Sequence, residues 1–164
     1  MVEIKALYGK KVFVDANAFI YFFTGQCNNI TAEIFRLSEE GSLTLITTTR
    51  VLDEVFFKVM IISAKIKFKI GSKIVQKLKK DKNKIKFLAE DVKKVVEFIN
   101  HLKMEIKEIS YSDLKKIPFI METYGLFGND ALILAVMQKF NLKYLLSSDS
   151  DFDEIEHIKR IEVL

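Results

Sequence analysis

The sequence has little cysteine, proline, glycine or tryptophan, and each shortage excludes a class of protein. Its 164 residues include one cysteine, one proline, six glycines and no tryptophan. Because Cys27 is alone, it cannot form an internal disulfide or a thiolate metal site, and a reducing, cytoplasmic setting is expected. The shortage of glycine and proline excludes collagen-like and low-complexity chains. With 49% hydrophobic and 29% charged residues, the sequence predicts one globular domain over residues 1–164.

Long uncharged hydrophobic runs are missing as well. A membrane-spanning helix needs about 18 or more consecutive apolar residues. The longest candidate, residues 117–138, is interrupted by Glu122 and Asp130. Residues 1–10 lack the apolar core and the small-residue cleavage site that a signal peptide requires. No membrane association is therefore expected.

Positive charge exceeds negative charge only slightly, but it is concentrated in one stretch. Lysine and arginine number 26 against 22 aspartates and glutamates, which gives a net charge of +4. Residues 65–86 contain ten lysines and a single acid, Asp81. Such a block can attract phosphate backbones. A solvated helix face is the simpler interpretation, and composition alone favours it.

Hydrophobic periodicity predicts strands that alternate with helices. Short apolar and β-branched runs predict strands over residues 11–15, 42–47, 104–109, 143–147 and 160–164. Helical spacing predicts helices over residues 16–23, 31–40, 49–63, 91–102, 112–124 and 129–140. A lysine-rich helical insertion is expected around residues 65–86, with a break at Gly71, and Pro118 should kink its helix unless it occupies a first turn. The alternation predicts a three-layer α/β/α sandwich around a central, mostly parallel sheet.

Four acids occupy positions that follow the predicted strands, where parallel sheets place their ligand sites. Asp15 ends the first strand, and Glu54 lies on the helix after the second. Asp130 opens the most apolar helix, and Asp149 follows the strand over residues 143–147. Each acid alone could be a helix cap or a rim charge. Gathered together they would repel one another unless a cation neutralised them, and oxygen ligands suit Mg²⁺ or Mn²⁺ rather than zinc.

The ordered set of motifs resembles the signature of PIN domains, including the VapC group of nucleases. The matching positions are Asp15 with Asn17, Glu54, Asp130 with Ala131, and Ser147 with Asp149, Asp151 and Phe152. Their order and spacing agree along nearly the whole chain. The resemblance implies a PIN-like fold and metal-dependent cleavage of RNA.

The resemblance also implies a role for each matching residue. The catalytic acids would be Asp15, Glu54, Asp130 and Asp149. Of these, Asp15, Asp130 and Asp149 would bind Mg²⁺ or Mn²⁺, and Glu54 would orient the attacking water or bind a second metal. The supporting hydrogen-bonding residues would be Asn17, Ser147 and Asp151. Asp149 is preferred to Asp151 as the fourth acid because it lies nearer the strand end, and Asp53, beside Glu54, should face elsewhere because adjacent helix positions diverge by about 100°.

A metal-dependent endoribonuclease that hydrolyses RNA phosphodiester bonds is therefore the leading interpretation. Its lysine-rich segment would guide RNA, with Lys73, Lys77 and Lys80 as the candidate contacts. The resemblance is compatible with a toxin of a toxin–antitoxin pair whose partner is a small antitoxin protein, with a role in RNA processing as the other option, and with a homodimer. The alternative is a non-catalytic PIN-like module that binds RNA or a partner protein in RNA processing.

Overall fold

The computed structural model describes residues 3–164, so the first two residues of the N-terminal segment considered above lie outside the described residues. The described strands are β1 (Lys11–Val14), β2 (Thr44–Thr48), β3 (Glu105–Lys107), β4 (Tyr144–Leu146) and β5 (Lys159–Ile161). They form one sheet in the order β3-β2-β1-β4-β5, and every neighbouring pair is parallel. The parallel sheet confirms the predicted fold class.

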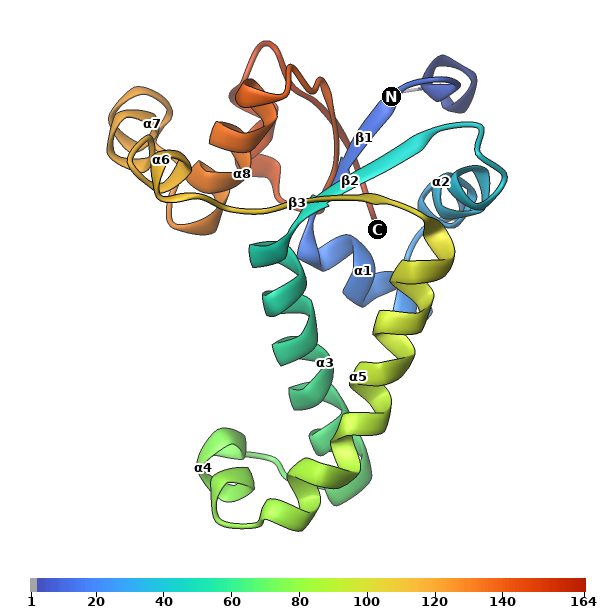
Figure 1. Cartoon of the computed structure of the whole chain (residues 1–164), viewed down its shortest axis with the longest axis vertical. Coiled ribbons are helices and arrows are strands. Elements are labelled where there is room, and N and C mark those ends of the chain that lie inside the picture. The colour runs from blue at the N-terminus through green and yellow to red at the C-terminus, as the bar shows by residue number, and fades with distance from the viewer. Residues whose placement is uncertain (1–2) are drawn as a thin grey trace.

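Helices cover both faces of this sheet. They are α1 (Ala16–Phe23), α2 (Asn29–Glu39), α3 (Thr49–Phe68), α4 (Ile74–Lys79), α5 (Lys82–Leu102), α6 (Tyr111–Leu114), α7 (Ile117–Tyr124) and α8 (Asn129–Lys139). Two 3-10 turns, Ile4–Leu7 and Ser150–Glu154, complete the described elements. The chain crosses from β1 to β2 to β3 and then returns past β1 to β4, so right-handed connections place α1–α5 and α6–α8 on opposite faces. Figure 1 shows these two groups on either side of the strands.

The core is centred on β1 and is rich in phenylalanine. Val12, Phe13 and Val14 are fully buried, because β1 is flanked by strands on both edges and by helices on both faces. Between the sheet and α5, Phe22 packs against Phe35 and Phe98 with ring centroids 4.5 and 5.1 Å apart. These contacts join α1, α2 and α5 beneath the sheet.

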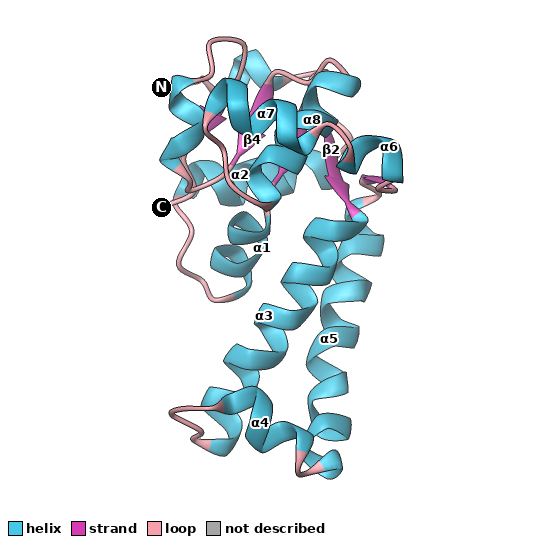
Figure 2. Ribbon diagram, turned by 90° about the vertical axis from the view of Figure 1, so that its left-hand side faces the viewer, coloured by secondary structure: helices cyan, strands magenta, loops and turns pink. Residues whose placement is uncertain are grey.

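A helical arm projects from the sheet domain. It consists of α3 and α5, each about 30 Å long at 1.5 Å per residue, with α4 at its tip (Figure 2). The tip has its own small core, formed by Ala64, Ile70, Leu78 and Leu88. The lysine-rich residues 65–86 occupy the end of α3, all of α4 and the beginning of α5.

The expected start of the helix over residues 91–102 was wrong. Helix α5 begins at Lys82, where the Asp81 side chain accepts a hydrogen bond from the Lys84 backbone N–H at 3.3 Å. Asp91 lies in the middle of the helix and pairs with Lys67 of α3 at 2.6 Å. The first turns of α5 are rich in lysine, and this hides their apolar positions in the sequence. Those positions continue the buried face formed by the later turns of the same helix.

Other boundaries differ by a few residues. The helix expected over residues 112–124 is divided into α6 and α7, and Pro118 lies in the first turn of α7, where its missing N–H removes no helical bond. The strands are shorter than expected, and β3 spans three residues. Within residues 3–164 no single helix is long and apolar enough to cross a membrane. The segment Tyr111–Tyr124 and helix α8 reach the required length and apolar content only when taken together, and they are bent by 103° relative to each other.

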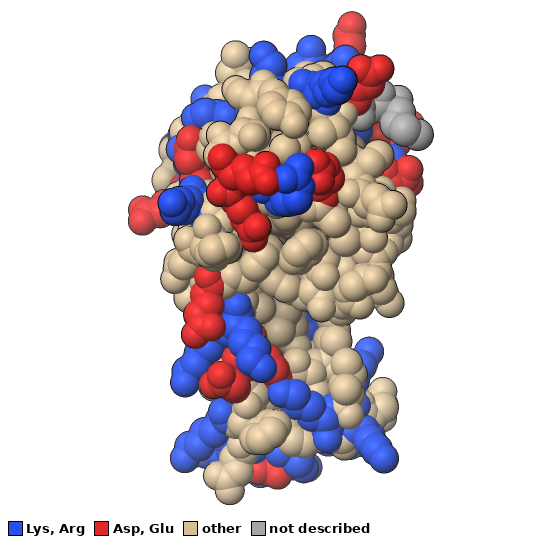
Figure 3. All heavy atoms as spheres, turned by 90° about the vertical axis from the view of Figure 1, so that its right-hand side faces the viewer, with Lys and Arg blue, Asp and Glu red and all other residues tan. Residues whose placement is uncertain are grey.

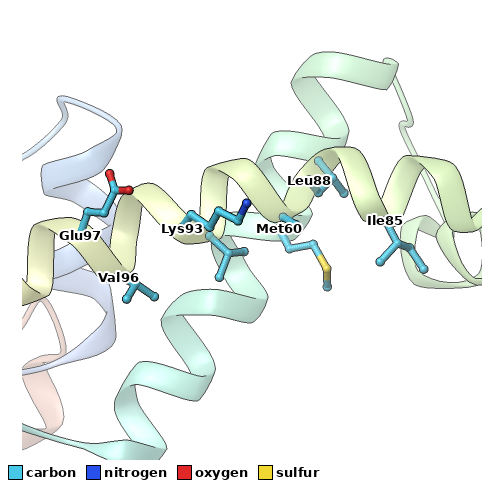
Figure 4. A pocket seen from close by; sticks show the side chains of 8 residues that line it. Met60, Ile85, Leu88, Lys93, Val96 and Glu97 are labelled. Atoms are coloured by element: carbon cyan, nitrogen blue, oxygen red, sulfur yellow. The ribbon is translucent and has the colours of Figure 1, made fainter.

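An apolar groove of about 430 Å³ lies on the arm. Its lining includes Met60 of α3 and Ile85, Leu88 and Val96 of α5 (Figure 4). None of the four acids singled out in the sequence lines it. The chemistry expected from those acids therefore belongs elsewhere in the fold.

Candidate active site at the carboxyl edge of the sheet

The acids meet where the direction of the chain reverses across the sheet. β1 and β4 are neighbours, and the connections that leave them run to opposite faces. Val14 pairs with Leu146, so the next residues, Asp15 and Ser147, emerge side by side at the carboxyl ends of the two strands. This switch point is where open parallel sheets bind their ligands.

Asp15 is held firmly at this point. Its side chain is almost completely buried and caps α1 by accepting the Ala16 backbone N–H at 2.6 Å. Its other oxygen, Oδ2, accepts hydrogen bonds from Asn17 Nδ2 at 2.6 Å and from Ser147 Oγ at 2.8 Å. Burial raises the pKa of Asp15, although these hydrogen bonds act in the opposite direction. The structure thus places Asn17 and Ser147 directly against Asp15.

The loop after β4 is attached to the same network. Asn17 Oδ1 accepts the Ser148 backbone N–H at 2.9 Å, and Ser147 Oγ accepts the Asp149 backbone N–H at 3.1 Å. Asp149 in turn caps the following 3-10 turn by accepting the Asp151 backbone N–H at 3.0 Å. Asp149 is half-buried and Asp151 is exposed. Both acids raise the pKa of Asp130, and Asp149 has the larger effect.

Glu54 approaches from α3, which begins immediately after β2. Thr48, the last residue of β2, caps α3 through its hydroxyl, which accepts the Val51 backbone N–H at 3.1 Å. Glu54 Oε1 lies 2.6 Å from Lys58 Nζ one turn further along the helix. By contrast, the Asp53 side chain is 78% exposed and pairs with Arg50, so only one of the two adjacent acids faces the site.

Asp130 enters from the other face of the sheet, in the first turn of α8. Gly128 precedes the helix with a φ of 57° and a ψ of −118°, a conformation that favours glycine. The half-buried Asp130 carboxyl has its pKa raised to about 7, first by burial and then by the negative charges of neighbouring acids. Those acids are Asp149, Asp15, Asp151 and Glu54, in order of effect. Five acids from four segments therefore lie close enough for the other four to affect the charge of Asp130.

The chemistry of this cluster fits a hard divalent cation. Its candidate ligands are all carboxylates, which are the ligands that Mg²⁺ and Mn²⁺ prefer. In the described part of the chain, Lys58 alone forms an ion pair with one of the four acids, so most of their charge is not neutralised. Across residues 3–164, however, no three His, Cys, Asp or Glu side chains stand close enough together to hold a metal ion as placed. The acids converge without forming a finished coordination shell.

Sequence reasoning missed two residues of this site. Asn129 Nδ2 donates to Glu54 Oε2 at 3.1 Å and so links α8 to α3. Lys58 contacts Glu54, and its position four residues along the same helix is the spacing at which opposite charges meet. That spacing was readable in the sequence, whereas the contact between Asn129 and Glu54 depends on the fold.

The lysines considered for RNA binding lie away from the acids. Lys73, Lys77 and Lys80 are exposed at the tip of the arm. The end of α3 at Phe68 is about 20 Å from Glu54 along the helix axis, at 1.5 Å per residue. The structure therefore brings together the predicted acids and their supporting residues but keeps the predicted lysines separate.

A five-stranded parallel sheet with acids from four segments at its switch point places the chain among α/β proteins that bind their ligands at the carboxyl ends of the strands. The model of the PIN domain family matches residues 12–158, and the chain belongs to that family.

Individual relatives agree with this assignment. The chain is 28% identical to Ribonuclease VapC6 of Methanocaldococcus jannaschii over 152 residues, which cover 92% of this chain and 96% of that protein. Its fold is similar to a chain of a toxin–antitoxin complex from Klebsiella pneumoniae, with a TM-score of 0.57, 17% identity and coverage of 90% of this chain and 95% of that one. It is also similar to a chain of VapBC2 from Rickettsia felis bound to a promoter DNA fragment, with a TM-score of 0.54, 16% identity and coverage of 94% and 99%. At these identities the two solved structures bear on the fold alone.

Proposed function

We propose that this PIN-domain protein is a metal-dependent endoribonuclease that hydrolyses RNA phosphodiester bonds and acts as the toxin of a toxin–antitoxin pair. The observation that carries the proposal is the meeting of Asp15, Glu54, Asp130 and Asp149 at the switch point, where mutual repulsion and burial raise the pKa of Asp130 to about 7. The relative named Ribonuclease VapC6 supports the same reaction.

The roles of the acids follow from their surroundings. Asp15, Asp130 and Asp149 would hold Mg²⁺ or Mn²⁺, and such an ion supplies positive charge that activates water and offsets charge developing on a phosphoryl group. The hydrogen bonds from Asn17 and Ser147 fix the orientation of the Asp15 carboxylate.

Glu54 would orient the attacking water. Among the described residues it is the one acid of the four that forms an ion pair, because Lys58 Nζ lies 2.6 Å from its Oε1. Asn129 holds its other oxygen at 3.1 Å. A carboxylate kept in place on both sides can accept a hydrogen bond from a water molecule in a defined direction. Asp151, which is exposed, adds negative charge to the rim of the site.

The arm would bind the RNA backbone at a distance from the acids. Among the ten lysines of residues 65–86, ion pairs join only Lys67 to Asp91 and Lys84 to Asp81 in the described part of the chain. The remaining positive charge is free to attract phosphates, and Figure 3 shows basic side chains covering much of the lower end of the arm. Because α3 begins where β2 ends, the arm leaves the sheet from the edge that holds the acids (Figure 1). An RNA strand held there by Lys73, Lys77 and Lys80 can continue to the site.

A small antitoxin protein is the proposed partner. The fold is similar to chains from toxin–antitoxin assemblies, and the arm has an apolar groove of about 430 Å³ that a protein segment can fill. Binding of such a partner would be seen as loss of cleavage when the partner is added in equal amounts. Size-exclusion chromatography with light scattering separates this complex from a homodimer of the chain.

The test of the reaction compares matched variants. Purified protein is incubated with end-labelled RNA in Mg²⁺, in Mn²⁺ and in EDTA. Cleavage is expected with either metal and not with EDTA, and it should be lost in Asp15→Asn, Asp130→Asn and Glu54→Gln. Asp53→Asn is the control, because that neighbour of Glu54 is 78% exposed and pairs with Arg50 rather than facing the other acids. Full activity of the Asp15 and Asp130 variants would refute the assignment, and salt-sensitive RNA binding without cleavage by wild type would indicate the non-catalytic module.

A further inference from the structure

A second groove, of about 550 Å³, adjoins the acidic cluster. It lies between the start of α3, the start of α8 and the segment that runs from β3 to α7. Its apolar lining consists of Ile109, Leu114, Ile117 and Leu132. Asn129 also lines it, and the same side chain donates to Glu54. A molecule bound in this groove therefore lies next to the acids.

Two polar features give the groove a chemical preference. Arg50 lines it and pairs only with the exposed Asp53 on its own helix, a weak interaction that a phosphate can replace. Asn129 Oδ1 is buried and has no hydrogen-bond partner among the described residues. The amide cannot be turned around, because the Glu54 carboxylate only accepts and therefore requires the nitrogen. Because this oxygen is buried, a ligand N–H pairs with it only if the Asn129 side chain shifts toward the groove.

Phe127 stands at the edge of this groove. Its side chain is 80% exposed, and it directly precedes Gly128, which belongs to the lining. The Phe127 carbonyl accepts the Asp130 backbone N–H at 3.1 Å, so the backbone of Phe127 is attached to the first turn of α8, while its exposed ring is free to turn toward the groove. Exposing a large aromatic side chain to water is unfavourable, and such side chains often mark binding sites. In proteins that bind single-stranded nucleic acids, exposed aromatic side chains stack on bases.

We propose that this groove binds a nucleobase of the RNA substrate at a position close to the cleaved bond, with Phe127 stacking on that base. An apolar floor accommodates one flat face of the ring, a small shift of Asn129 lets its unpaired amide oxygen accept from a ring N–H group, and Arg50 lies near an adjoining phosphate. The inference rests on the proposed ribonuclease function and adds a positioning role for residues outside the acidic cluster.

The experiment pairs enzyme variants with altered substrates. An RNA oligonucleotide that wild type cleaves is prepared with one abasic position at a time, moved through the nucleotides that flank the cleaved bond. Wild type, Phe127→Ala and Phe127→Tyr are compared by kcat and KM. The matched control is Phe119→Ala, because Phe119 is a 65% exposed phenylalanine of the adjacent helix α7 whose chain neighbours, unlike Gly128 beside Phe127, do not line the groove.

The proposal predicts a specific pattern of KM values. Phe127→Ala should raise KM about tenfold with a smaller change in kcat, whereas Phe127→Tyr and Phe119→Ala should resemble wild type. At one position the abasic substrate should raise the KM of wild type by a similar factor and that of Phe127→Ala much less, because the stacking partner is already lost.

Two results would overturn it, and they are distinguishable from each other. If wild type cleaves RNA but Phe127→Ala retains the wild-type KM, the groove does not hold a base, and a protein partner becomes the better candidate for covering it. If wild type cleaves no RNA with any divalent cation, the proposed function fails and this inference fails with it.

Discussion

The repulsion at Asp130 predicts that removing its charge stabilises the metal-free protein while abolishing activity. In the folded state, burial and the neighbouring acids raise the pKa of Asp130 from the ordinary 3.8 to about 7. At 1.36 kcal/mol for each step of one in pKa, this rise corresponds to about 4 kcal/mol. Because the side chain is only half-buried, screening by solvent reduces the expected effect to about 2 kcal/mol.

The sign follows from proton linkage. Between pH 4 and about 7 the folded protein binds more protons than the unfolded chain, so stability falls as pH rises through this range. Asp130→Asn removes this pH-dependent loss of stability, because asparagine does not titrate. In urea unfolding with EDTA, the free energy of unfolding of the variant should equal that of wild type near pH 4 and exceed it by about 2 kcal/mol at pH 8. Adding Mg²⁺ at pH 8 should stabilise wild type more than the variant, because the ion replaces the missing positive charge.

Two outcomes would refute this reasoning. A stability difference that is equal at pH 4 and pH 8 would mean that the carboxyl does not titrate as described. A variant less stable than wild type at pH 8 in EDTA would mean that the acids do not repel one another. Asp53→Asn serves as the control and should show neither effect, because the Asp53 side chain is 78% exposed.

Three further predictions follow from other parts of the molecule. The Asp113 side chain is 2% exposed, and its hydrogen bond to Lys139 holds its pKa at about 2, so Asp113→Asn should cost about 2 kcal/mol at neutral pH. This cost should vanish as pH falls from 4 to about 2, which urea unfolding at several pH values measures. In the tip core, Leu88→Ala should cost about 2–5 kcal/mol locally, and hydrogen exchange should show the arm losing protection while β1 keeps it. The third concerns the lysines Lys73, Lys77 and Lys80. Their combined change to glutamine should weaken RNA binding and lower the slope of log K against log salt by about 2–3, as fluorescence anisotropy would record, and an unchanged slope would exclude RNA contact at the tip.

The strand ends were predictable because they depend on local signals. The run of residues 11–15 is short, apolar and followed by an acid, which is sufficient to place a buried strand with Asp15 at its carboxyl end. Parallel-sheet topology then implies that the other acids after strands point to the same edge. Asp15 and Asp149 could be identified in this way, whereas Asp130 was singled out by its place at the start of the most apolar helix.

The arm was harder to predict from the sequence. The first turns of α5 are so rich in lysine that their apolar stripe is hidden, and Asp91, which looks like a helix start, instead pairs with Lys67 across to α3. A sequence window contains only neighbours along the chain, whereas this helix is stabilised by a partner helix more than twenty residues away. Its true start is therefore a tertiary property.

The sequence by itself determined the class of sheet, the acids that end its strands and the charge of residues 65–86, because each is set by residue type and spacing along the chain. Only the tertiary structure decided which of these groups meet. It joined Asn129 to Glu54, raised the pKa of Asp130 first by burial and then by the charges of other carboxylates, and left Phe127 exposed beside an apolar groove. The physical reason is that burial, repulsion and unpaired hydrogen-bonding atoms exist only between segments that folding brings into contact.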